Sequence, residues 1–188
     1  MAKTGNHSNS KTAVLQIIGE GEPVQIKLSG ENDSGFGFQV NLDVAHAPER
    51  SFFADECLIS AKGDLARFCF VQRSIFSEEG RALLIMNMPL PTAKEFTRAI
   101  QPSFDGIKPL QSDLKKEPID TLSLASNFVR GGTNASGAIL DFYYLSPFVA
   151  LRVNPTTTAI PMTAVMRVHM GEAAYGNFLA CVKEVIGV

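Results

Sequence analysis

Hydrophobic and polar residues alternate most regularly between residues 36 and 44. Apolar residues occupy every second position from Phe36 to Val44, and glycine or polar residues lie between them. Successive side chains of a β-strand point to opposite faces, so this pattern predicts a strand with one buried and one solvated face. Shorter runs predict a hairpin before it, formed by residues 12–18 and 23–29.

A strand followed by a helix is predicted twice along the chain. Residues 82–88 form an apolar run, prolines interrupt it, and residues 92–100 carry apolar side chains at helical spacing. Residues 159–170 and 171–186 repeat that order. Four pairs of positions lie 82 residues apart: Met88 and Met170, Ala93 and Tyr175, Phe96 and Phe178, and Ile100 and Val182.

Each of these strands follows a predicted hairpin. Residues 52–60 and 65–73 form the first, and residues 125–130 and 138–145 form the second around the glycine-rich turn 131–137.

The second hairpin lies about 71 residues after the first, whereas the helices lie 82 apart. The difference predicts an insertion at residues 146–158, with an extra or edge strand at 149–153.

We therefore predict an α+β protein with two tandem antiparallel βββα-type repeats, related by a pseudo-twofold axis and preceded by an N-terminal hairpin. The expected organisation is a disordered tail (1–11), the hairpin with the first repeat (12–101), a linker (102–123) and the second repeat (124–188).

Composition narrows the possible partners. The 188 residues are 45% hydrophobic and 19% charged, which is ample for a core, and the net charge is −2. This balance argues against sequence-independent nucleic-acid binding, which needs a concentrated basic face. The first residues are polar and no apolar run reaches the roughly 18 residues of a membrane span. We expect a cytoplasmic protein without disulfides.

The histidines suggest no metal site. His7, His46 and His169 are far apart in sequence, and no cluster of ligands accompanies them. We therefore expect no metal and no cofactor.

A cysteine–histidine pair could form in space from Cys57, Cys69 or Cys181 with His169. However, Cys69 lies between two phenylalanines and Cys181 lies on the apolar stripe of the last predicted helix, together with Val185. Buried structural thiols explain both better than nucleophiles do. The glycines at 131–137 precede a predicted strand rather than a helix, which favours a hairpin turn over a phosphate-binding loop.

Residues 142–148 place aromatic or apolar side chains on both faces of one predicted strand. The helix of the same repeat covers one face, and either the other repeat or a partner must cover the second. The candidate interface residues are Phe142, Tyr143, Tyr144, Leu145 and Phe148.

Three segments carry a resemblance to a known family: Phe53-Ala54-Asp55, then Arg67-Phe68-Cys69-Phe70, then Met88 through Ala93-Lys94-Glu95-Phe96. Their order is similar to an uncharacterised family of small bacterial proteins that open with Tyr-Ala-Asn or Tyr-Ala-Asp and continue with an Asp-Phe-x-Leu-x-Phe strand. Those proteins close with Met-Ser-Pro-x-His-Ala-Lys-x-Leu and a helix. Thr92 stands in place of the family histidine. The resemblance implies a fold and no activity.

The expected function is that of a non-enzymatic protein-binding or scaffold component of a bacterial multi-protein assembly, because apolar strand faces are abundant and no catalytic constellation is evident. One alternative is a chaperone-like holdase for unfolded clients. Another is a small-ligand receptor or an enzyme with a site at the repeat interface. The expected partner is a protein or a second copy of the chain, and whether a small molecule binds is left open.

Overall fold

The computed structural model describes residues 13–15, 24–28, 36–43, 46–73, 81–100, 120–134, 137–150, 152 and 159–187. The chain divides into two compact units, one made of Met1–Asp43 with Phe148–Pro161 and the other of Val44–Pro147 with Met162–Val188. This division separates the N-terminal hairpin from the residues up to 101 with which the sequence had grouped it. The predicted tail at 1–11 lies outside the described residues.

The first unit contains one four-stranded sheet, in the order β1-β2-β3-β11. Its strands are β1 (Ala13–Leu15), β2 (Val24–Leu28), β3 (Phe36–Asp43) and β11 (Ala159–Pro161). β1 and β2 pair antiparallel, which confirms the predicted hairpin, and β2 pairs antiparallel with β3. β11 pairs parallel with β3.

The expected strand at 149–153 is wrong where the structure describes it. Pro147–Ala150 form the one-turn helix α2. Proline suits the first position of a helix, because the amide hydrogen it lacks has no partner there.

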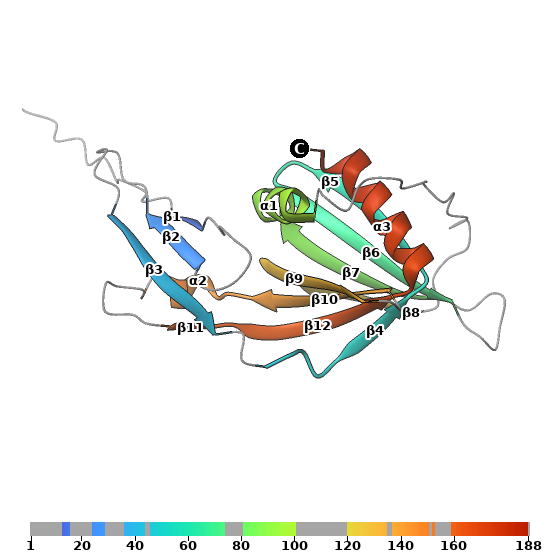
Figure 1. Cartoon of the computed structure of the whole chain (residues 1–188), viewed down its shortest axis with the longest axis horizontal. Helices are drawn as coiled ribbons and strands as arrows, with labels where there is room; N and C mark the ends of the chain where they lie inside the picture. Colours follow the sequence, from blue (N-terminus) through green and yellow to red (C-terminus); the bar gives the residue numbers. More distant parts are fainter. Residues whose placement is uncertain are drawn as a thin grey trace, which may run out of the picture. The chain divides into compact units, whose positions relative to one another are not determined.

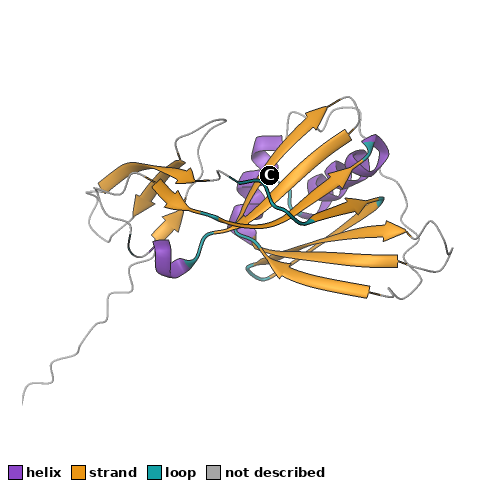
Figure 2. Ribbon diagram, turned by 90° about the horizontal axis from the view of Figure 1, so that it is seen from below, coloured by secondary structure: helices purple, strands orange, loops and turns teal. Residues whose placement is uncertain are grey.

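The second unit contains two four-stranded sheets (Figure 1). One has the order β5-β6-β7-β8, with β5 (Glu56–Lys62), β6 (Leu65–Arg73), β7 (Arg81–Pro89) and β8 (Asp120–Ala125). The other has the order β4-β12-β10-β9, with β4 (Ser51–Ala54), β12 (Thr163–Met170), β10 (Gly137–Tyr144) and β9 (Phe128–Asn134). Strands make up most of this unit, as Figure 2 shows.

Neighbouring strands of both sheets are antiparallel except at one edge of each sheet. There, β8 is parallel to β7 and β4 is parallel to β12. The α+β class with antiparallel sheet parts is therefore confirmed.

The single strand predicted at 52–60 is wrong, because the chain changes sheets at Asp55. β4 pairs with β12, and after Asp55 the chain pairs with β6 as β5. The amide of Asp55 donates to the carbonyl oxygen of Val71 at 2.8 Å, which begins the new pairing.

A second change of sheet joins β8 to β9. β8 begins at Asp120, inside the stretch expected to be a linker, and pairs with β7. The chain then turns into β9, where the amide of Asn127 donates to the carbonyl oxygen of Tyr143 at 3.1 Å.

Two more predicted boundaries are corrected. Residues 159–170 do not form one strand, because the chain divides at Met162 into β11 and β12, which belong to different sheets. Gly131 and Gly132 are not in a turn but in β9, paired with Leu140 and Ile139. The hairpin itself is confirmed, and it joins two strands rather than a strand and a helix.

One helix follows the last strand of each antiparallel meander, α1 (Leu90–Ile100) after β7 and α3 (Glu172–Val185) after β12. α1 buries Ala93, Phe96 and Thr97, and the Thr97 hydroxyl is satisfied by donating to the carbonyl oxygen of Ala93 at 2.8 Å.

The second of these helices, α3, packs mainly against β5. The side-chain amide of its buried Asn177 donates to the carbonyl oxygen of Cys57 at 3.1 Å and so fastens the helix to that edge strand. Val185, predicted in the apolar stripe, is exposed, whereas Leu179 is buried.

Phe178 of α3 lies at the centre of the core. Its ring centroid is 6.1 Å from those of Phe68, Phe70 and Phe96, and Phe70 meets Phe142 edge-on at 5.8 Å. These rings come from both sheets and both helices, so one aromatic cluster joins the whole unit.

Gly137 is the residue at which backbone freedom matters most. Its φ is +138°, and a β-carbon there would overlap with the carbonyl oxygen of Met170. Glycine alone adopts this conformation without strain. A β-carbon on Gly132, two strand positions from the same hairpin turn, would meet no atom within 4 Å.

We predict that Gly137→Ala lowers the free energy of unfolding by about 2 kcal/mol or more, because the methyl group adds both backbone strain and overlap. Gly132→Ala is the matched control and is expected to change it by less than about 1 kcal/mol. Urea denaturation of both variants measures the difference. Equal effects would show that Gly137 is not constrained as described.

Candidate functional site

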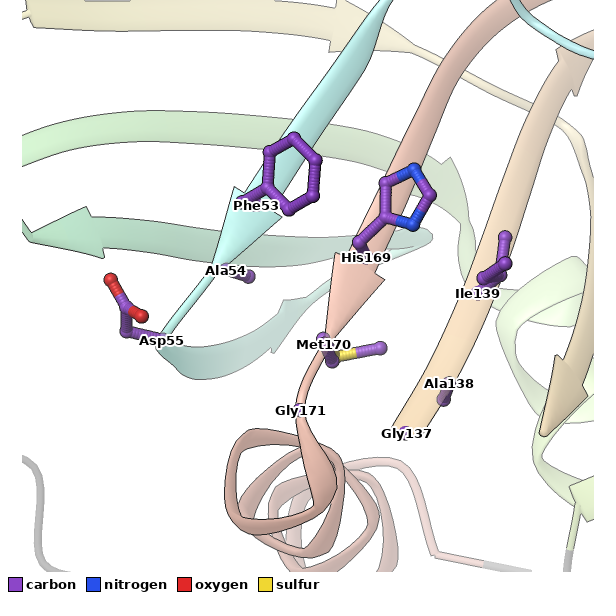
Figure 3. A pocket seen from close by; sticks show the side chains of 9 residues that line it. All are labelled: Phe53, Ala54, Asp55, Gly137, Ala138, Ile139, His169, Met170 and Gly171. Carbon is purple, nitrogen blue, oxygen red and sulfur yellow. The ribbon is translucent and has the colours of Figure 1, made fainter. Parts of the chain in front are cut away.

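An open pocket of about 310 Å³ lies where β4 and β12 end and β10 begins (Figure 3). Most of its lining is apolar. The lining residues are Phe53, Ala54, Asp55, Gly137, Ala138, Ile139, His169, Met170 and Gly171.

The rings of Phe53 and His169 stack beside this pocket. The two residues are register partners on the parallel strands β4 and β12, and their ring centroids are 4.8 Å apart with planes inclined by 14°. This separation is close to the spacing of neighbouring strands, so the sheet itself places the rings face to face. Ile139 is the partner of His169 on β10, and the three side chains form one row (Figure 3).

Phe53 is unusual in its exposure. The ring is 59% exposed, whereas its chain neighbour Ala54 points into the core and is buried. Alternation along β4 therefore directs Phe53 to the solvent face of the sheet. The surface around Phe53, His169 and Ile139 is called the Phe53 surface below.

Polar groups occupy the rim where β4 ends. A carboxylate oxygen of Asp55 accepts the backbone N–H of Arg73 at 2.8 Å, which holds this exposed side chain at the point where the chain changes sheets. Gly171 precedes α3 and offers no side chain to cap the helix.

An ion pair lies two residues along the same strands from the Phe53 surface. Two nitrogens of the Arg167 guanidinium, Nε and Nη2, each donate to one carboxylate oxygen of Asp141 at 2.6 Å. This bidentate contact raises the pKa of Arg167. Burial, together with the charge of Asp141, raises the pKa of the Tyr143 hydroxyl.

The interface residues predicted from sequence do not form one exposed surface. Phe142, Tyr143 and Leu145 are buried within the chain. Phe142 packs against Phe70, and the ring of Tyr143 lies 6.0 Å from that of Phe128. Of the five candidates, half-buried Tyr144 and 78% exposed Phe148 remain accessible, and Phe148 belongs to the first unit.

Among the described residues, the histidines and cysteines do not gather into one cluster. His46 is exposed, His169 stacks on Phe53, and His7 lies outside the described residues. In the described ranges no group of three or more histidine, cysteine or acidic residues could hold a metal ion. The same ranges contain no helix long and apolar enough to cross a membrane.

The surroundings of the three thiols favour the protonated form. Burial raises the pKa of Cys57 well above its usual range, and burial also raises the pKa values of half-buried Cys69 and Cys181. The thiol of Cys181 points at the carbonyl oxygen of Cys57 at 3.5 Å rather than at a histidine. The thiolate is the reactive species, so these surroundings disfavour nucleophilic chemistry.

Sequence reasoning did not single out the Phe53 surface. Phe52 and Phe53 are consecutive, so one of them had to face away from the core in any strand, and this was the available signal. The register that brings His169 beside Phe53 joins segments more than 100 residues apart and leaves no local trace.

Comparison with known proteins found no family model, no curated protein and no solved structure that matches the chain.

We predict that the stability of the protein falls as pH rises through the ordinary thiol range near 8.5. A raised folded-state pKa means that the folded state binds more protons there than the unfolded state, so the contribution is full below this range and is lost above it. Cys57→Ala should be less stable at pH 7 but lose less stability between pH 7 and pH 10. Parallel curves for the two proteins in urea denaturation would contradict the burial of this thiol.

Proposed function

We propose that the chain is a non-enzymatic protein-binding component that docks a segment of a partner protein on the Phe53 surface. The observation that carries this proposal is the 59% exposed ring of Phe53, stacked on His169 beside an open, mostly apolar hollow. Exposed aromatic side chains next to a hollow are typical anchors of protein interfaces, because they bury a large rigid area on binding.

The surroundings of His169 favour binding over catalysis. A general base needs a polar group that orients its ring and a reacting group within hydrogen-bond reach. His169 instead lies in a row between Phe53 and Ile139. The hollow is also open, which suits a side chain of a partner better than an enclosed small ligand.

We also propose that the second unit is a tandem duplication with a pseudo-twofold relation. Residues 51–54 are exposed, half-buried, exposed and buried, and residues 123–126 have the same order. The bonds at the two changes of sheet also correspond. Arg73 donates its backbone N–H to the Asp55 carboxylate, and Leu145 donates its own to the Asn127 side chain at 2.7 Å.

These correspondences have an offset of 72 residues, one more than the offset of 71 expected from sequence, and the helices keep the offset of 82. The remaining ten residues then fall between β10 and β12, in the region where an insertion was expected. Topology supports the same proposal, since the first strand of each segment, β4 or β8, pairs parallel with the last strand of the other, β12 or β7.

The proposed duplication supports a binding role for the Phe53 surface. The positions that correspond to Phe53 and His169 in the other sheet are Ala125 and Asn87. The side-chain amide of Asn87 donates to the hydroxyl of Ser123 and to the carbonyl oxygen of Leu124, at 2.9 and 3.0 Å. One of two equivalent positions thus carries the stacked rings and the other is closed by hydrogen bonds, which is the divergence expected where one copy acquires a binding role.

An experimental structure tests the duplication. We predict that one rotation of about 180° superposes residues 51–73 on 123–145 and, at the same time, residues 82–100 on 164–182. Two unrelated rotations for the two segments would contradict a pseudo-twofold axis.

For the binding function we predict that Phe53→Ser reduces capture of a stoichiometric partner by about tenfold or more, because the variant removes the central apolar anchor. Affinity purification of the tagged protein from its native source, followed by mass spectrometry, is the measurement. Phe148→Ser, which removes another highly exposed phenylalanine, is the control and should leave capture unchanged.

The same experiment separates the alternatives. Many clients in non-stoichiometric amounts would favour a holdase. Equal losses for both variants would show that general surface hydrophobicity, rather than the Phe53 surface, accounts for binding.

A further inference from the structure

β8 is an edge strand with an exposed main chain. It pairs with β7 on one side and ends the sheet β5-β6-β7-β8 on the other. Thr121, Ser123 and Ala125 are exposed, and Leu122 is 42% exposed although its register partner Leu84 is fully buried. A leucine this exposed on the core side of a sheet indicates that a further strand beside β8 would be needed to bury it.

The hydrogen bonds of β8 show which backbone groups face outward. The amide of Ser126 donates to the carbonyl oxygen of Asn87 at 2.9 Å. In a parallel ladder, alternate residues direct both backbone groups to the same neighbour. The residues that direct both groups to the free edge are therefore Thr121, Ser123 and Ala125. Within the described part of the chain, no main-chain hydrogen bond reaches these three peptide groups.

Apart from Asp120 at its first position, β8 also lacks the features that keep edge strands apart. Residues 121–125 read Thr-Leu-Ser-Leu-Ala, with no lysine, no proline and no acidic side chain. Proteins usually protect an exposed edge with one of these, because unpaired N–H and C=O groups are a template for another strand. An edge strand without these features is consistent with one that pairs with another strand in the functional state of the protein.

We propose that two copies of the chain pair antiparallel through β8 about a twofold axis at Ser123, which joins two four-stranded sheets into one of eight strands. In this register Ser123 lies opposite Ser123 of the second copy, Thr121 opposite Ala125, and Leu122 opposite Leu124. All three outward-facing residues of each copy then form hydrogen-bonded pairs.

The sequence of β8 favours a second copy over an unrelated strand. Around Ser123 the strand is self-complementary, since leucine meets leucine on the core face and small residues meet small residues on the other. Asp120 falls opposite Ser126 of the second copy, so no two acidic residues face each other. An isologous contact of this kind satisfies each interaction twice. The pairing does not involve the Phe53 surface and does not depend on the function proposed for it.

Disulfide trapping with Ser123→Cys tests the register. Residues of a hydrogen-bonded pair lie about 5.5 Å apart between Cα atoms, which is within the range of a disulfide. We expect Ser123→Cys to form a covalent dimer on mild oxidation, read on a non-reducing gel against the wild type. Thr121→Cys is the matched control on the same face of the same strand, and it should form no covalent dimer because its partner position is 125. Thr121→Cys with Ala125→Cys should restore the link.

Light scattering after size exclusion tests the association without oxidation. The wild type and Ser123→Ala should have about twice the chain mass of 20.3 kDa. Ser123→Pro removes an outward N–H and no main-chain hydrogen bond to β7, and, like Ser123→Ala, it loses the hydroxyl that accepts from Asn87. It should be a monomer with an unchanged circular dichroism spectrum. Equal trapping of the variants at 123 and 121, or a wild type that stays monomeric across a concentration series, would overturn the proposal.

Discussion

The second unit depends on two exchanged strands. Neither antiparallel meander, β5-β6-β7 or β9-β10-β12, completes its own four-stranded sheet, and each receives an edge strand from the segment that precedes the other. The hydrogen bonds that turn the chain from one sheet to the other involve Asp55 and Asn127, whose side chains each accept a backbone N–H of a neighbouring strand. The aromatic cluster around Phe178 contains rings from both sheets. The core therefore depends on the two changes of sheet.

Local patterns predicted the elements that local chemistry determines. The β5–β6 turn contains Gly63 at φ 59°, as a tight turn of this kind requires, and the helix after β7 begins within one residue of the prolines that mark it. The alternation of Phe36 to Val44 became β3, and the last helix lies within one residue of its expected bounds.

The other features of the fold depend on pairing between segments that are far apart in the chain. The sequence pattern contained no signal for that pairing. Residues 52–60 are apolar enough to form one strand, and only the partners β12 and β6 divide them at Asp55. Within the aromatic run at 142–148, the strand ends at Tyr144, where Phe142 and Tyr143 are both buried, whereas Phe148 is exposed. Periodicity alone does not distinguish burial within the same chain, such as the packing of Phe142 against Phe70, from burial by a partner. The Phe53 surface was missed for the same reason, because its two rings meet through a register and not through a motif.

The exchange of strands has a consequence for the chain as it is being synthesised. β4 is made before its partner residues Arg167 to Met170, which follow more than 100 residues later in the chain. Until then the short Ser-Phe-Phe-Ala strand has no sheet to join, and the chain carries an unpaired apolar segment while the residues between the two strands are made. Contacts between distant segments slow folding and prolong exposure to aggregation. The β4–β12 pairing therefore delays completion of this unit until Met170 has been made.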